Sequence, residues 1–272
     1  MCNFVFLTVQ LMTITFYKYQ GTGNDFVIID NRDKKLSKND TKLIKHLCDR
    51  KFGIGADGCM FLEEPSVSGD DFTMVYFNAD GNESTMCGNG GRCLVAFAKQ
   101  IGVVNDSANF TAIDGPHDAT ITGGLVKLGM QNVNEIKASE SHWWLDTGSP
   151  HHVQPVNNIK EYDVFTNGRN IRRGAPYFEE GTNVNFVEQV NDDTFSVRTY
   201  ERGVEDETLS CGTGVTAVAI AMHKSKTTSA KQVNLETPGG KLTITFDENE
   251  GAYKNVYLEG PATLVFKGTI EW

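Results

Sequence analysis

The chain has 272 residues, a length that fits one large domain or two of ordinary size. Hydrophobic residues make up 39% and charged residues 22%, with only 7 prolines, which excludes a disordered or fibrous chain. The formal charge is −10 and no stretch is dense in Lys or Arg, so nucleic acid and anionic membranes are poor partners.

The first eleven residues differ in pattern from the rest of the chain. Residues 1–11 are apolar but lack a basic n-region and a small-residue cleavage site, so a secretory signal is not predicted. Met12 precedes an alternating stretch, Thr13–Tyr19, that predicts a first strand. We therefore expect the fold to begin near Met12 and residues 1–11 to be an appendage.

The remaining elements are mainly short strands. A Ser37–Cys48 helix is predicted from Ser37 as N-cap and apolar residues at helical spacing. The expected strands after the first are Phe26–Asp30, Gly58–Leu62, Phe72–Phe77, Ala119–Leu128, Asn183–Glu188, Thr194–Tyr200, Lys241–Phe246 and Ala262–Phe266. Mostly β structure with a few helices indicates an α+β fold rather than a doubly wound sheet.

Two segments share one plan: a strand, a polar turn, a Cys-Gly step and an apolar helix. The first runs through Cys87-Gly88 into a helix over Cys93–Ile101, and the second through Cys211-Gly212 into Val215–Met222. Similar phrases, Gly23–Val27 and Asn183–Val187, stand upstream of the two segments. We interpret this pattern as an internal duplication.

The predicted helices lack a polar face. A helix that is apolar all round must be buried all round, so each is expected inside a strongly curved, mostly antiparallel β-structure. Two such pseudo-symmetric halves fit 272 residues.

Cys87 and Cys211 stand where a helix begins. Free backbone N–H groups and the positive end of the helix dipole stabilise a thiolate there, so we expect lowered thiol pKa values. The glycines after each cysteine let a ligand approach the backbone, and the same N–H groups suit a carboxylate. Two such cysteines in mirrored settings suit proton transfer on opposite faces of one carbon.

The other cysteines give no comparable pattern. Cys48, Cys59 and Cys93 have apolar neighbours and are interpreted as small buried hydrophobes. No pair has the C-x₂₋₄-C spacing of a metal site, so no metal is predicted. Without a disulfide framework or an apolar run of the ~20 residues that a membrane span needs, we expect a cytoplasmic protein.

At these residues the sequence resembles the diaminopimelate epimerase family, from about Met12 to the C-terminus. The ordered phrases that carry the resemblance are Gly21–Phe26, Phe52–Gly58, Phe77–Gly81, Cys87–Cys93, Gly148–His151, Thr182–Phe186, Tyr200–Gly203, Cys211–Gly214 and Thr237–Gly240. The resemblance implies two halves with the active site between them, here residues 12–130 plus 262–272 and residues 131–261. It also implies cofactor-independent inversion of LL-diaminopimelate to the meso form, for lysine and peptidoglycan synthesis.

The resemblance assigns roles by motif. Cys87 and Cys211 become the acid/base pair, assisted by His151 and Glu201 respectively. The implied substrate-binding positions are Asn24, Asn78, Gly88, Asn89, Asn183, Glu201, Arg202, Gly212 and Thr213. A small-molecule amino-acid substrate is the expected partner, no cofactor is expected, and a homodimer is left open.

The chain departs from the family's pattern at two positions, and two other functions stay open. Ser149 replaces a substrate-contacting Asn, and Gly58 stands where many members have Gln. Both changes concern substrate contacts more than the reaction type. The alternatives are a racemase or epimerase of another amino acid, such as proline or hydroxyproline, and a non-catalytic binding protein.

Overall fold

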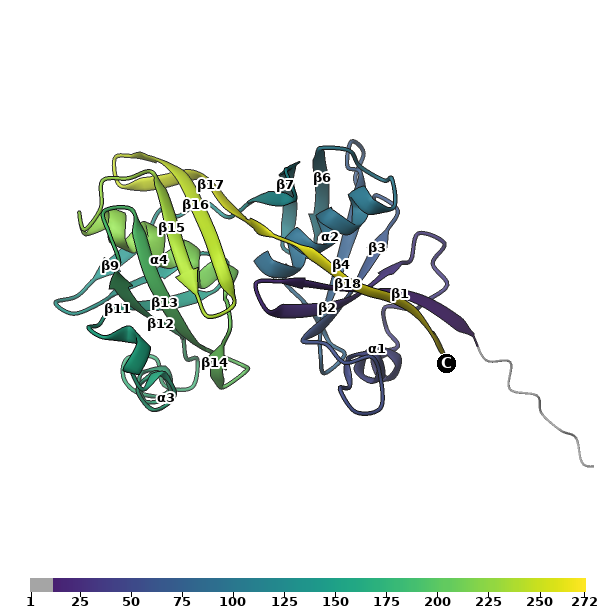
Figure 1. Cartoon of the computed structure of the whole chain (residues 1–272), viewed down its shortest axis with the longest axis horizontal. Helices are drawn as coiled ribbons and strands as arrows, with labels where there is room; N and C mark the ends of the chain where they lie inside the picture. Colours follow the sequence, from purple (N-terminus) through teal and green to yellow (C-terminus); the bar gives the residue numbers. More distant parts are fainter. Residues whose placement is uncertain (1–11) are drawn as a thin grey trace, which may run out of the picture.

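The computed structural model describes residues 12–272 as two lobes joined by strands that pass between them (Figure 1). The predicted appendage, residues 1–11, lies outside the described residues. Within the part of the chain that is described, no helix is long and apolar enough to cross a membrane.

The N-terminal lobe holds the first ten elements and the last strand. Its elements are β1 (Thr13–Gly21), β2 (Asn24–Asp30), α1 (Thr41–Cys48), β3 (Gly58–Glu63), β4 (Phe72–Asn78), β5 (Glu83–Ser84), α2 (Gly88–Gln100), β6 (Ser107–Ala112), β7 (Gly115–Thr122), β8 (Leu125–Gly129) and β18 (Thr263–Glu271).

The C-terminal lobe holds the elements between β8 and β18. They are β9 (Ile136–Ala138), β10 (Trp143–Asp146), β11 (Pro150–Pro155), the 3₁₀ helix η1 (Ile159–Glu161), α3 (Val164–Arg173), β12 (Asn183–Gln189), β13 (Thr194–Glu201), β14 (Asp206–Thr208), α4 (Gly212–Lys224), β15 (Gln232–Thr237), β16 (Gly240–Asn249) and β17 (Ala252–Pro261).

Strand pairing runs without a break through both lobes. β17 pairs with β16 in the C-terminal lobe and with β8 of the N-terminal lobe. The chain then crosses into β18, which pairs antiparallel with β1 (Figure 1). The two lobes therefore share a hydrogen-bonded ladder in addition to the covalent connections.

Each lobe is built around one buried helix, as its apolar sequence predicts. In α4, every residue from Val215 to Met222 is buried, within a cluster supplied by the surrounding strands. In α2, Leu94, Val95, Phe97 and Ala98 are buried in the corresponding cluster. The expected α+β fold, with curved β-structure around a central helix, is confirmed.

The order of pairings repeats in the two lobes. In the first, β2 and β3 are parallel, β3 pairs antiparallel with β4, and β4 is parallel to β6. In the second, β11, β12, β13 and β15 repeat these three pairings. β12 is thus the equivalent of β3, so the match of Gly23–Val27 with Asn183–Val187 was wrong. Short phrases of similar composition do not establish equivalent positions, whereas strand pairing does.

Several element boundaries differ from the sequence prediction: α2 and α4 begin earlier, at Gly88 and Gly212, β18 extends to Glu271, and two further differences have a clear local cause. The single strand expected over Ala119–Leu128 is a hairpin, because Gly123 and Gly124 turn the chain with φ values of 59° and 84°. The first helix begins at Thr41 instead of following Ser37, because the Asp40 side chain accepts from the backbone N–H of Leu43.

Candidate active site

The N-terminal ends of α2 and α4 meet head-on between the lobes. A Cβ atom on Gly88 would lie 3.5 Å from the Cα of Gly212, and one on Gly212 would lie 3.3 Å from the Cα of Gly88. Leu258 Cδ2 stands 3.0 Å from both of these positions. Glycine at both positions leaves room for this close approach, which brings the free N–H groups of two helices to one place. Such a place suits an anion, in particular a carboxylate.

Cys87 is the N-cap residue of α2 and is half-buried. Its thiol lies 3.5 Å from Asn24 Oδ1, and the side-chain amide of Asn89 reaches the same oxygen at 3.4 Å. Asn24 in turn donates to Asp57 Oδ2 at 2.7 Å. Arg50 also donates to Asp57, at 2.7 Å. The structure therefore brings together three residues predicted for the site, Cys87, Asn24 and Asn89, and adds Asp57 as the group that fixes Asn24.

Cys211 is the N-cap residue of α4 and is buried. Its Sγ lies 3.4 Å from the hydroxyl of Thr213, which lies 2.9 Å from His151 Nε2. The resemblance assigned His151 to Cys87. Among the described residues no hydrogen bond joins those two, and His151 instead reaches Cys211 through Thr213.

The hydrogen-bond network around His151 indicates which ring nitrogen carries the proton. Asn185 Nδ2 donates to the carbonyl of His152 at 3.0 Å, and Asn185 Oδ1 accepts from the Thr199 hydroxyl, so the orientation of the amide is fixed. The same Nδ2 lies 3.0 Å from His151 Nδ1, which must then accept. The proton is on Nε2, which donates to Thr213 and leaves the Thr213 hydroxyl free to donate to Cys211.

Burial keeps His151 neutral. Loss of solvent, followed by the charge of Arg202, lowers the pKa of His151 to about 3. Sequence reasoning did not identify this hydrogen-bond network from Asn185 to Thr213, although all of its members except His152 and Thr199 lie in the phrases that carry the family resemblance.

The thiol pKa values differ from the sequence prediction. Burial raises the pKa of Cys87, and the N–H groups of Gly90 and Asn89 only partly oppose it. Burial and the charge of Glu201 raise the pKa of Cys211, against hydrogen bonds from Thr213 and Gly214. The expected lowering was wrong for this arrangement, because the cost of desolvating a thiolate exceeds what the helix start returns.

Glu201 and Arg202 enter the site from the end of β13. Glu201 is half-buried, and its pKa is raised above the ordinary value. Burial is the main cause and the charge of Asp57 from the other lobe adds to it, while the Thr208 hydroxyl opposes them. The backbone N–H of Arg202 donates to Asn183 Oδ1 at 2.8 Å. Asn183 then donates to the Pro150 carbonyl at 3.2 Å, which ties β12 to β11.

Two predicted positions have fewer contacts. Asn78 is exposed at the end of β4, and its side chain makes no hydrogen bond within residues 12–272. Ser149, the residue that departs from the family's pattern, lies 3.0 Å from His151 Nε2 and 3.2 Å from the Thr213 hydroxyl. Ser149 therefore belongs to the Cys211 network.

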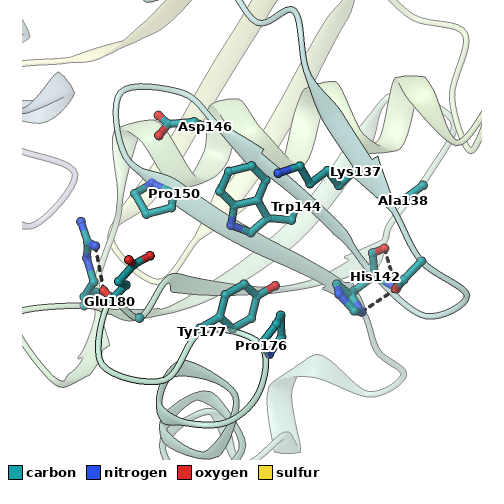
Figure 2. Close-up of a pocket in the computed structure, with 12 residues that line it drawn as sticks. Lys137, Ala138, His142, Trp144, Asp146, Pro150, Pro176, Tyr177 and Glu180 are labelled. Atoms are coloured by element: carbon teal, nitrogen blue, oxygen red, sulfur yellow. Dashed lines mark hydrogen bonds between the residues drawn. The ribbon is translucent and has the colours of Figure 1, made fainter.

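A separate cavity of about 540 Å³ opens in the C-terminal lobe beside the site (Figure 2). Trp144 and Tyr177 form its apolar walls, and Lys137 Nζ lies 4.6 Å from the Trp144 ring centre. It adjoins the site through Arg202, which donates to the Glu180 carbonyl at 3.0 Å. Neither Cys87 nor Cys211 lines it, and the sequence did not predict it.

No group of three or more His, Cys, Asp or Glu side chains among residues 12–272 is arranged to hold a metal ion. The polar side chains of the site instead converge on the two thiols and the two helix starts.

Solved structures with the same fold include isomerases. A phenazine biosynthesis protein of the PhzF family from Bacillus anthracis matches with a TM-score of 0.75 at 14% identity, over 95% of this chain and 99% of that one. A hydroxyproline epimerase from Agrobacterium vitis matches with a TM-score of 0.68 at 13% identity, over 97% and 93%. At these identities the likeness shows the fold alone.

Sequence comparison is more specific and makes the chain an isomerase. Proteins named diaminopimelate epimerase from Flavobacterium psychrophilum and Aquifex aeolicus are 52% and 40% identical to it, covering 93% and 94% of this chain and 99% and 97% of theirs. The sequence profile described as diaminopimelate epimerase matches residues 16–135 and 143–265. The chain belongs to the diaminopimelate epimerase family.

The neutral state of His151 predicts a pH-dependent stability. Unfolding returns its pKa from about 3 to about 6.5, so below pH 6.5 the unfolded chain binds a proton that the folded chain does not. Stability should therefore fall as the pH falls. Between pH 7 and pH 5 the wild type should lose about 2 kcal/mol more than His151→Gln, which cannot titrate. Denaturant unfolding at the two pH values measures this, and equal losses in the two proteins would contradict it.

Proposed function

We propose that this chain inverts the α-carbon of LL-diaminopimelate to give the meso form, using Cys87 and Cys211 as the two proton-transfer groups. The observation that carries the proposal is the head-on meeting of two helix starts, each preceded by a cysteine. The names of its relatives supply the substrate.

The helix starts provide the electrostatic part of the mechanism. The α-proton of an amino acid is weakly acidic, so its removal requires stabilisation of the carbanion as it forms. The negative charge develops towards the α-carboxylate. Backbone N–H groups that follow Gly88 and Gly212 are fixed before the reaction, and they stabilise that charge without reorganisation. Asn89 and Thr213, in the first turns, lie beside the same carboxylate.

The two thiols provide the proton transfers. One thiolate removes the α-proton from one face while the other thiol donates a proton to the opposite face, which inverts the centre. Each cysteine comes from a different lobe. Closure of the lobes therefore brings acid and base to the two sides of one carbon and excludes water from them.

Because the pKa values of both thiols are raised, substrate binding is expected to help form the thiolate that acts as the base. Glu201 and the Cys87 thiolate both raise the pKa of Cys211, so two thiolates at once are disfavoured. The ammonium group of an amino-acid substrate brings positive charge beside the thiols, which lowers their pKa. At Cys211 the Thr213 hydroxyl, held by neutral His151, adds a donor to the thiolate.

The remaining predicted positions are proposed as substrate contacts. Asn24, Asn183 and Arg202 lie in the hydrogen-bond networks of the two lobes, and Glu201 lies close enough to both thiols to act on their charge. Asn78 is exposed at the end of β4, and its side-chain amide makes no hydrogen bond to another residue within 12–272. We therefore propose that it binds substrate directly. Ser149 forms contacts with His151 and Thr213. We propose that Asn183 makes the substrate contact that an Asn at position 149 makes in other members of the family.

Removing either thiol tests the mechanism. Cys87→Ala and Cys211→Ala should each lower kcat for inversion of LL-diaminopimelate at least about 10³-fold, because each reaction direction needs both groups. The matched control is Cys48→Ala, a buried cysteine outside the site, which should keep near-normal turnover. Near-normal inversion by either active-site variant would rule out the two-base mechanism, and inversion of proline or hydroxyproline in preference would overturn the substrate.

We further propose that the two lobes correspond to residues 12–130 plus 262–272 and residues 131–261. Neither lobe is expected to act alone, and the protein is expected to work in the cytoplasm.

We also propose that the protein is a homodimer, and the support for this is β18. It pairs with β1 on one side, and it exposes Leu264, Val265 and Phe266 in succession. A long strand edge with exposed apolar side chains favours pairing with a second chain.

A charge on this strand tests the dimer. Val265 is 55% exposed, so Val265→Lys should fold normally but oppose association of two such edges. Light scattering after size exclusion should give a dimer for the wild type and a monomer for the variant. A monomeric wild type, or a variant that remains dimeric, would contradict an interface at β18.

A further inference from the structure

The ring of Tyr76 fills the space that a side chain at position 58 would occupy. A Cβ on Gly58 would lie 2.7 Å from Tyr76 Cε2 and 3.0 Å from its hydroxyl oxygen. Tyr76 and Gly58 lie on adjacent antiparallel strands, β4 and β3. The same Cβ would lie 2.7 Å from the Phe77 carbonyl oxygen, so both the backbone of β4 and the Tyr76 ring require glycine at position 58.

The equivalent position in the other lobe carries a polar side chain. Gly58 begins β3 and pairs with Phe26, whereas Asn183 begins β12 and pairs with His151 in the matching parallel pair. Asn183 binds the Arg202 backbone and the Pro150 carbonyl at the site. In the N-terminal lobe, the polar group at this place is the hydroxyl of Tyr76.

This hydroxyl has no protein partner in the described part of the chain. Tyr76 is 9% exposed, its ring packs edge-on against Phe26 at 6.2 Å, and within residues 12–272 the hydroxyl makes no hydrogen bond. The hydroxyl oxygen keeps some contact with solvent, so a ligand that enters the space between the lobes can form a hydrogen bond with it.

Two carboxylates, Glu201 and Asp57, act on Tyr76, and Arg50 pairs with Asp57. Burial raises the pKa of Tyr76 well above the ordinary value, followed by the charges of Cys87, Glu201 and Asp57, so the hydroxyl stays neutral. Gly58 directly follows Asp57, whose carboxylate holds Asn24 beside Cys87. Glu201 comes from the opposite lobe, which places Tyr76 on the N-terminal wall of the space between the lobes.

We infer that Tyr76 is a substrate-binding residue whose hydroxyl accepts a hydrogen bond from an ammonium group of the substrate. An ammonium is the group that these carboxylates favour, and a neutral hydroxyl oxygen next to it supplies an acceptor. This inference rests on the proposed function, since the substrate must carry an amino group.

The test is the Tyr76→Phe variant assayed with LL-diaminopimelate. Phenylalanine keeps the ring above Gly58 and removes only the hydroxyl, so thermal unfolding should be unchanged. KM should rise about tenfold, as expected for one lost hydrogen bond to a charged group, while kcat stays within about threefold. The matched control is Tyr17→Phe in the same lobe, whose ring packs on Phe97 at 4.8 Å; its KM should stay at the wild-type value.

The outcomes separate this inference from the proposed function. If the wild type inverts diaminopimelate but Tyr76→Phe keeps the wild-type KM, or loses kcat alone, the role of Tyr76 is overturned and the proposed function stands. If the wild type does not invert diaminopimelate, both are overturned.

Discussion

The close approach of Gly88 and Gly212 is the constraint on which the rest of the structure depends. Glycine at the meeting point lets the two helices approach end to end, since a Cβ on either glycine would already lie within 3.5 Å of the other glycine's Cα. Like helix ends repel each other, because both carry positive partial charge. The arrangement therefore costs free energy in the free protein, and a bound carboxylate offsets that cost.

Contacts between the lobes, next to the cysteines, keep the two helix ends together against this repulsion. The Thr22 hydroxyl, in the turn between β1 and β2, donates to Ser210 Oγ at 2.9 Å. Asn89 donates to the Ser210 carbonyl at 3.1 Å. Ser210 immediately precedes Cys211, so these bonds fix the second thiol relative to the first helix. Shared pairing of β17 with both lobes limits how far they can separate.

The sequence predicted the parts of this site that depend on local pattern. A cysteine before Gly at the start of an apolar helix identified Cys87 and Cys211, and the lack of a polar face predicted that α4 is buried. It could not predict partners set by strand pairing. Asn183 was matched to the wrong strand, and the contact of His151 with Thr213 was not predicted.

Burial was the other property that local pattern did not supply. The N–H groups at a helix start lower a thiol pKa, but the surrounding strands remove solvent from Cys211, and the cost of this desolvation is larger. The role inferred for Tyr76 likewise depends on the pairing of β3 with β4, since Gly58 and Tyr76 are 18 positions apart in the sequence. A residue whose role depends on contacts made only in the folded chain can be identified from the structure but not from the local sequence.

The most direct measurement is a crystal structure of the Cys87→Ala variant with LL-diaminopimelate bound. We predict that the α-carboxylate accepts hydrogen bonds from backbone N–H groups in the first turns of both α2 and α4. The α-carbon should lie between the Cβ of residue 87 and the Sγ of Cys211. A carboxylate bound away from both helix starts, for example by Lys137 in the neighbouring cavity, would contradict the proposed mechanism.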